Sequence, residues 1–241
     1  EDIAKFRGKY RQGWDKLREQ RYRRQIEMGL IEERWPLSPR ESTSPAWADL
    51  SEQEQIRFDD MMAIYAAMIH RVDINVGLLV DHLRSIGQFD NTLILFMSDN
   101  GGNAESGPNG RYLGDQPGDP NSTVFLGQNW AAVNNTPFRK FKHYVHEGGS
   151  ATPLIAHWPA GIAQSQRGTI AHQPGHVIDI MPTLVELAGA DYPAQRDNHD
   201  IEAMEGVSLA PVLAGNLISR DQPLFFNHEE NRAVRDGKWK L

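Results

Sequence analysis

Cysteine is absent from the 241 residues of this chain, which excludes disulfide bonds, thiolate zinc sites and a cysteine nucleophile within it. An excess of positive charge is also missing: the formal net charge is −7, so the overall charge gives no reason to expect a nucleic-acid partner. Long apolar runs are missing too. The longest runs, such as Leu93–Met97, are far too short to cross a bilayer, and we therefore expect no membrane span.

The composition that remains is that of a soluble globular protein, with 39% hydrophobic and 24% charged residues. We predict a basic helix and a Pro-rich linker over residues 1–50, a main α/β domain over 51–215, and the beginning of a strand or hairpin region over 216–241. Because the chain begins at Glu1 without a methionine and stops inside an apparent strand at Leu241, we expect a fragment of a longer protein. Periplasmic, extracellular and cytoplasmic locations are all open, and so is the oligomeric state.

Two helices are predicted in the first third of the chain. Residues 3–34 read as a basic helix, for which a solvated face is a better interpretation than a nucleic-acid or acidic partner, because the segment shows no aromatic-basic patch pattern. Ser51 begins the second helix, with Glu54 completing a capping box, and Gly87 is expected to end it. Between them, apolar residues recur at spacings of three and four and indicate one long amphipathic helix: Ile64, Met68, Val72, Val76, Leu79, Leu83 and Ile86.

A continuous apolar run, Thr92–Met97, predicts a strand buried on both faces, as in a parallel sheet covered by helices. The residues Ser98 to Gly102 follow at its carboxyl end, where ligands bind in open α/β sheets. Asp99 and Asn100 supply two adjacent hard oxygen donors, and the glycines after them allow the backbone to turn sharply beside a ligand. The alternative is an ordinary turn, since Asp, Asn and Gly are the usual turn residues.

The next segment, residues 103–135, shows no sustained period and predicts a long irregular loop that could form a substrate wall or lid. After it, the basic residues Arg139, Lys140 and Lys142 lie close in sequence to two histidines, His143 and His146. A cation near a carboxylate-held metal is what an anionic, tetrahedral substrate needs. A solvated basic loop with partly buried histidines is the alternative, and the sequence assigns no role to either histidine.

The remainder continues the α/β pattern. The sequence predicts a turn at Glu147–Gly149, a strand over 154–158, a helix over 177–188, a strand over 224–226 and a hairpin around Asp236–Gly237. The expected fold class is therefore α/β, with a mostly parallel sheet between helical layers and a candidate site at the carboxyl ends of its strands.

Several motifs, taken together and in this order, resemble the arylsulfatases of the alkaline-phosphatase-like superfamily. They cover most of the chain from about residue 50 onward and comprise the helix around Asp73 and Gly77, Leu95 to Glu105, Thr136 to Lys142, Glu147 to Ile155, Trp158–Pro159, His176 to Leu184, and Asp236 to Leu241. Each motif alone is unspecific, whereas the ordered set is specific.

The resemblance implies hydrolysis of aryl or carbohydrate sulfate esters at a site with one divalent cation, usually Ca²⁺, with Mg²⁺ also compatible with hard oxygen ligands. Asp99 and Asn100 match the family's metal-binding pair. Lys142 matches the lysine that contacts the sulfate or the leaving oxygen, and it is therefore both the catalytic and the substrate-binding candidate. In the family, the nucleophile is a formylglycine made from the Cys or Ser of a Cys/Ser-x-Pro-x-Arg motif.

This chain departs from the family in lacking that motif. The formylglycine, in its Cys or its Ser form, and the other metal ligands are expected in an N-terminal portion outside the chain, and we expect the chain alone to be inactive. Two alternatives remain open: a phosphodiesterase or phosphonate hydrolase of the same superfamily, or a non-catalytic remnant of the fold.

Overall fold

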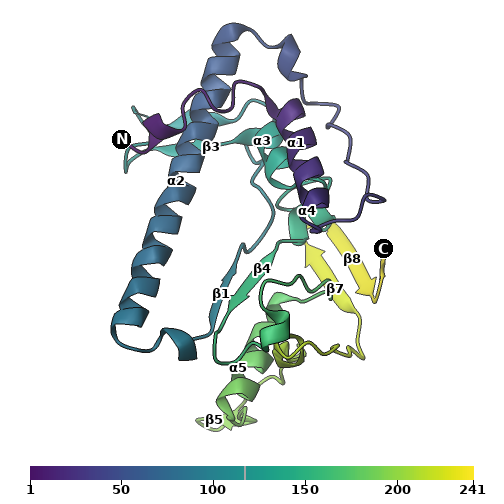
Figure 1. Cartoon of the computed structure of the whole chain (residues 1–241). Coiled ribbons are helices and arrows are strands. Elements are labelled where there is room, and N and C mark those ends of the chain that lie inside the picture. The colour runs from purple at the N-terminus through teal and green to yellow at the C-terminus, as the bar shows by residue number, and fades with distance from the viewer. Residues whose placement is uncertain (117) are drawn as a thin grey trace.

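The computed structural model describes residues 1–116 and 118–241, and it confirms an α/β chain (Figure 1). The helices are α1 Trp14–Glu27, α2 Glu52–Ser85, α3 Gly127–Asn134, α4 Glu147–Ser150, α5 Ile180–Ala188 and α6 Ala210–Leu213, with short 3₁₀ turns at Ile3–Lys5, Trp47–Asp49, Phe89–Asn91, Gln164–Gln166 and Val177–Asp179. The strands are β1 Ile94–Met97, β2 Arg111–Leu113, β3 Thr123–Phe125, β4 Leu154–His157, β5 Gln195–Arg196, β6 His199–Asp200, β7 Leu224–His228, β8 Asn231–Asp236 and β9 Trp239–Lys240.

The N-terminal helix is shorter than predicted. Of the expected span 3–34, α1 covers only Trp14–Glu27, and Gly13 precedes it with a φ of 85°. A Cβ at Gly13 would lie 2.1 Å from Cγ of Trp47, so both the left-handed backbone and the close indole require glycine. The basic pattern indicated a helix but could not place its start, which depends on the contact of Gly13 with Trp47, a residue far along the chain.

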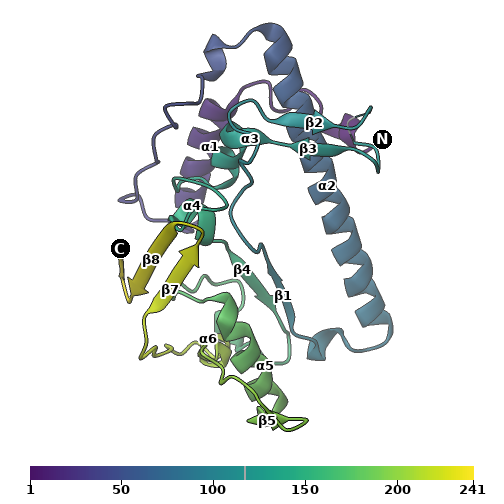
Figure 2. The same cartoon turned by 180° about the vertical axis from the view of Figure 1, so that it is seen from behind.

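The long helix α2 is confirmed, including its start and end. The Ser51 side chain accepts from the backbone N of Glu54 at 3.3 Å, and the Glu54 carboxylate accepts from the backbone N of Ser51 at 2.8 Å, which completes the predicted capping box. Gly87 follows the helix with a φ of 68°. The helix runs along one side of the molecule, from the end that holds α1 and α3 to the end near β1 (Figures 1 and 2).

Only the first half of α2 is buried. Its buried side chains include Phe58, Met61 and Ile64, whereas Met68, Val72 and other apolar residues of the predicted stripe are exposed. An 18-residue window of α2 has a mean hydropathy of 1.4, and 17% of that window is buried. By length and composition alone α2 could cross a membrane, which the shortness of the uninterrupted apolar runs did not indicate. A mostly buried core helix passes the same test, and in α2 the buried residues lie in the first half.

An aromatic core joins α1, α2 and α3. Trp14, Phe58 and Trp130 are 2% exposed or less and pack edge to face, with ring centroids 5.0–5.5 Å apart between Trp14 and the other two. The indole of Trp130 donates to the backbone O of Phe58 at 3.0 Å, which satisfies its polar atom in the core. Residues 1–50 thus share a core with the following segment, and the division at residue 50 stays a prediction.

The expectation of a long irregular loop over residues 103–135 is wrong for part of that segment. Its later part holds a small hairpin, β2–β3, and the helix α3, which supplies buried Trp130 to the core. These elements are three to eight residues long, too short to show a period in a sequence rich in Gly and Asn. The residues before β2 remain irregular and lie beside the candidate site.

The strand pairing differs from the expected parallel sheet. β1 pairs with β4 in antiparallel register, with Leu95 opposite Ala156, and every strand pair that residues 1–116 and 118–241 form is antiparallel. Phe96 is 49% exposed and Ile155 60% exposed, so β1 and β4 are not buried on both faces. The apolar run predicted the strand itself, but it carries no information on the direction of its neighbour.

The backbone of the turn after β1 is in direct contact with the backbone of the segment before β4. The backbone N of Gly101 donates to the backbone O of Gly149 at 3.0 Å. A Cβ at Gly101 would lie 1.8 Å from the backbone O of Gly148, and one at Gly149 would lie 1.9 Å from the backbone O of Tyr144. The lack of a Cβ at Gly101 allows the two segments to approach this closely, and the lack of one at Gly149 allows its own segment to fold back against Tyr144.

The C-terminal strands β7, β8 and β9 form a three-stranded sheet, and the predicted hairpin at Asp236–Gly237 is confirmed. Glu147, the first residue of α4, forms ion pairs with this sheet. Its Oε1 accepts from Arg235 Nη2 at 2.8 Å and from Lys240 Nζ at 2.7 Å. Burial raises the pKa of Glu147, but the hydrogen bonds and charges of Lys240 and Arg235 outweigh it, and the pKa lies below its ordinary value.

Replacing Gly101 with alanine should destabilise the crossing of the two loops. We expect Gly101→Ala to lower the free energy of unfolding by about 1–3 kcal/mol, because a methyl group there must displace a carbonyl oxygen. The matched control is Gly77→Ala, on α2, where a Cβ meets nothing within 4 Å. It should leave stability unchanged or raise it by about 0.5–1 kcal/mol. Urea unfolding measures both, and equal effects of the two substitutions would contradict the steric argument.

Glu147→Gln should remove the pH dependence that the Glu147 carboxylate gives to the free energy of unfolding. A folded-state pKa below the ordinary value of 4.5 means that the carboxylate stabilises the fold above that pH and loses this contribution as the pH falls through the folded-state pKa. The variant should be less stable than the wild type at pH 7, by about 1–3 kcal/mol, because two partly buried cations lose their partner. The difference should shrink below pH 4.5. Exposed Glu186→Gln is the control in urea unfolding at each pH, and a Glu147→Gln deficit that stays constant with pH would refute the linkage.

Candidate active site

Asp99 and Asn100 lie in the turn that follows β1, at its carboxyl end as predicted. Asn100 Nδ2 donates to the backbone O of Gly101 at 2.8 Å, and within residues 1–116 and 118–241 its Oδ1 accepts no hydrogen bond. Asp99 is exposed, and its carboxylate has no hydrogen-bond partner within residues 1–116 and 118–241. The Ser98 hydroxyl donates to the backbone O of Asn100 at 2.9 Å, and the Thr152 hydroxyl donates to the backbone O of Ser98 at 2.8 Å, so the turn is tied to the segment that leads into β4.

The segment that carries Lys142 is hydrogen-bonded to the same turn. The backbone N of Lys142 donates to the backbone O of Gly102 at 3.1 Å. Buried Asn135 links the two segments a second time: its Oδ1 accepts from the backbone N of Gly102 at 2.7 Å, and its Nδ2 donates to the backbone O of Lys140 at 2.9 Å. The structure therefore joins the two sequence motifs through backbone and Asn135 hydrogen bonds. Asn135 was missed from the sequence, because one Asn in an Asn-rich segment gives no signal.

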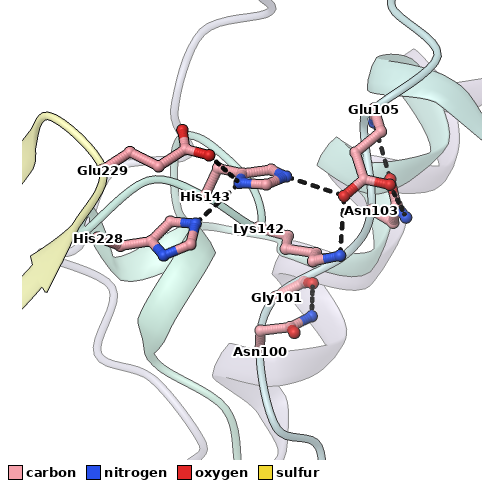
Figure 3. A network of polar contacts seen from close by, with 8 residues as sticks. All are labelled: Asn100, Gly101, Asn103, Glu105, Lys142, His143, His228 and Glu229. Atoms are coloured by element: carbon pink, nitrogen blue, oxygen red, sulfur yellow. Dashed lines mark hydrogen bonds and ion pairs between the residues drawn. The ribbon is translucent and has the colours of Figure 1, made fainter.

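Glu105 holds the side chain of Lys142 in place and was also missed as a site residue. Its Oε1 accepts from Lys142 Nζ at 2.8 Å and lies 2.8 Å from Nε2 of His143, and Asn103 donates to its other oxygen at 3.0 Å (Figure 3). The hydrogen bonds from Lys142, His143 and Asn103, in that order, lower the pKa of Glu105 to about 2. Glu105 is thus ionised at neutral pH and orients both the ammonium group and the imidazole.

The two histidines of the basic segment have different surroundings. His143 is half-buried and lies between Glu105 and the C-terminal sheet, with Nδ1 2.9 Å from Nε2 of His228. His146 precedes α4, and its Nδ1 is buried without a hydrogen-bond partner in the part of the chain that the structure describes. Burial and then the charges of Arg139, Lys140 and Lys240 lower the pKa of His146, which favours a neutral ring at pH 7.

The arrangement combines a carboxylate and a carboxamide oxygen on one loop with an oriented ammonium group on the adjoining loop. The donor set of Asp99 and Asn100 fits a hard cation such as Ca²⁺ or Mg²⁺, which takes oxygen ligands. Two residues are a partial set, because Ca²⁺ takes about six to eight oxygens. Together with Lys142, they could neutralise an anionic group from two sides.

Comparisons with known proteins agree with these motifs. The family model described as Sulfatase matches residues 3–190. An uncharacterised sulfatase of Schizosaccharomyces pombe is 33% identical over 100% of this chain and 46% of its own length, and an arylsulfatase of Klebsiella aerogenes is 33% identical over 90% of this chain and 48% of its own. A solved structure of BT4656 with D-glucosamine-2-N,6-O-disulfate has 22% identity and a TM-score of 0.46, over 80% of this chain and 34% of that one.

This chain therefore spans about half the length of the two sulfatases that it matches in sequence. The matched residues 3–190 include the turn with Asp99 and Asn100, the segment with Lys142 and the Glu147–Gly149 turn, and they make up most of the chain. On this evidence the chain belongs to the sulfatase family.

Proposed function

We propose that this chain forms part of the active site of an enzyme that hydrolyses sulfate esters to an alcohol and sulfate. The observation that carries the proposal is the pair of backbone hydrogen bonds, Lys142 N to Gly102 O and Gly101 N to Gly149 O, that joins the loop of Asp99 and Asn100 to the loop of Lys142. In this proposal, Asp99 and Asn100 bind a divalent cation, Ca²⁺ or Mg²⁺, through side-chain oxygens. When bound, such a cation supplies Lewis-acid neutralisation of the sulfate oxygens.

Lys142 binds the sulfate group and stabilises negative charge on the departing oxygen. Its ammonium group is already desolvated in part and oriented by Glu105, so little reorganisation is needed when an anion arrives. Glu105 is a positioning residue rather than a catalytic one, because it touches Lys142 and not the substrate. An arriving sulfate competes with Glu105 for the same ammonium hydrogens, and the exposed position of Glu105 permits the exchange.

The nucleophile lies outside these residues in our proposal. Family membership implies a formylglycine, and the chain contains no Cys/Ser-x-Pro-x-Arg from which it could be made. The remaining ligands of the cation are proposed to come from the same N-terminal portion. The related phosphonate and phosphate ester hydrolases also need a metal ion and a positively charged side chain. A sulfate ester and a phosphonate ester should therefore be tested side by side.

In the full-length protein, Lys142→Ala should lower kcat for an aryl sulfate by about 10²–10³-fold, the usual effect of removing one group that stabilises developing charge. Circular dichroism and calcium affinity should stay unchanged, because Lys142 is not a metal ligand in the proposal. Exposed Lys238→Ala, on the C-terminal hairpin, is the matched control and should keep full activity. Unchanged kcat for Lys142→Ala would remove the lysine from the mechanism, and faster turnover of a phosphonate monoester than of the aryl sulfate would favour the alternative hydrolase.

The 241-residue chain alone should not hydrolyse an aryl sulfate, because the proposed nucleophile is missing from its sequence. The measurement is release of the phenol by the purified chain in millimolar Ca²⁺, with the full-length protein as the positive control. Turnover by the chain alone, at any rate above that of its Lys142→Ala variant, would show that the nucleophile lies within these residues.

A further inference from the structure

Three potential metal ligands meet beside the candidate active site, although their segments lie far apart in sequence. His143 comes from the loop before α4, His228 is the last residue of β7, and Glu229 follows it in the turn between β7 and β8 (Figure 3). Nδ1 of His143 is 2.9 Å from Nε2 of His228 and 3.8 Å from Oε1 of Glu229. One ligand atom from each of the three lies within 4.8 Å of the other two. The proposed hydrolysis uses none of these three side chains.

Glu105 determines which nitrogen of His143 carries the hydrogen. An ionised carboxylate can only accept hydrogen bonds, so Nε2 of His143, 2.8 Å from Oε1 of Glu105, is the donor. Nδ1 of the neutral ring then presents its lone pair toward His228 and Glu229. A metal-binding histidine typically donates its other nitrogen to a carboxylate in this way, which fixes the tautomer and makes the ligand nitrogen more basic.

The backbone at this cluster is held in an unfavourable conformation. His143 has a φ of 80° and Glu229 a φ of 53°, both in the left-handed region that residues with a Cβ rarely adopt. Such conformations persist only where the surrounding structure imposes them, and they concentrate at functional sites. Here they direct side chains from two loops toward one point, and the rings of His143 and His228 stack with their centroids 5.1 Å apart.

We propose that His143, His228 and Glu229 bind a divalent transition-metal ion of the zinc class through Nδ1, Nε2 and a carboxylate oxygen. In a tetrahedral zinc site with bonds of about 2.0–2.2 Å, neighbouring ligand atoms lie roughly 3.3–3.5 Å apart. The separations of 2.9 Å and 3.8 Å lie on either side of that value, so small side-chain rotations suffice. The remaining position is open to water.

This site differs in chemistry from the calcium site proposed at Asp99 and Asn100. Imidazole nitrogens favour zinc, nickel or cobalt, whereas a carboxylate and a carboxamide favour Ca²⁺ or Mg²⁺. A bound ion would connect the loop of Lys142 to the C-terminal sheet, close to the ion pairs of Glu147 that already join the two. The inference does not depend on the hydrolysis of sulfate esters, because it rests on other side chains.

Calorimetric titration of the full-length protein with Zn²⁺, in millimolar Ca²⁺ to fill the oxygen-ligated site, tests the proposal. The wild type should bind one zinc ion that His228→Ala binds more than about 100-fold more weakly or not at all. Glu229→Gln should weaken binding by at least about tenfold, and Glu105→Gln by about 10–100-fold, as expected for a group that orients a ligand. Exposed His199→Ala, distant in sequence from the cluster, is the matched control and should titrate like the wild type.

Equal zinc binding by the wild type and by folded His228→Ala would overturn the proposal, as would the absence of zinc binding by the wild type. The two histidines would then form only a hydrogen-bonded pair. Cobalt provides a test on the wild type that needs no variant: Co²⁺ should give the intense visible absorption of a tetrahedral site, and zinc should displace it. A weak, octahedral-type spectrum would contradict the proposed ligand set even if every variant failed to fold.

Discussion

The close backbone contact between Gly101 and the Gly148–Gly149 pair is the constraint on which the candidate site depends. The distance from a Cβ at Gly101 to the backbone O of Gly148 would be 1.8 Å, so no side chain fits between the two loops. Once these backbones are in contact, the hydrogen bond from Lys142 N to Gly102 O can form, and the loops that carry the candidate oxygen donors and the ammonium group adjoin. A steric property of three residues thus sets the distances between charged groups that lie about forty residues apart in sequence.

Two carboxylates, those of Glu105 and Glu147, also hold the segments around the candidate site together. Glu105 orients Lys142 and His143 from one side, and Glu147 holds Arg235 and Lys240 of the C-terminal sheet from the other. Because each carboxylate is shared between two donors, the loss of one carboxylate leaves two donors without that partner rather than one. The donors around the candidate site are therefore held by acidic partners that come from different parts of the chain.

The sequence predicts the local elements well wherever a residue acts on its immediate neighbours. The Ser51–Glu54 capping box, the strand that ends at Met97 and the hairpin at Asp236–Gly237 all depend on contacts within a few residues, and all are confirmed. The start of α1, the helix α3 and the direction of β4 depend on distant contacts, and each was missed or wrong. The same distinction applies to the site. Asp99, Asn100 and Lys142 follow from motifs, whereas Glu105 and Asn135 are recognisable only once the loops are in contact.

The pairing of β1 with β4 has a practical consequence for work on this chain. Among the described residues, these two strands form a sheet of only two strands, so each has an outer edge whose backbone groups are not paired to another strand. Apolar side chains such as Phe96 and Ile155 are exposed on the same strands. Open edges with apolar side chains are the usual starting points for strand-to-strand association between molecules. Samples of the isolated chain should therefore self-associate as their concentration rises, and dilute solutions are the appropriate choice for measuring its properties.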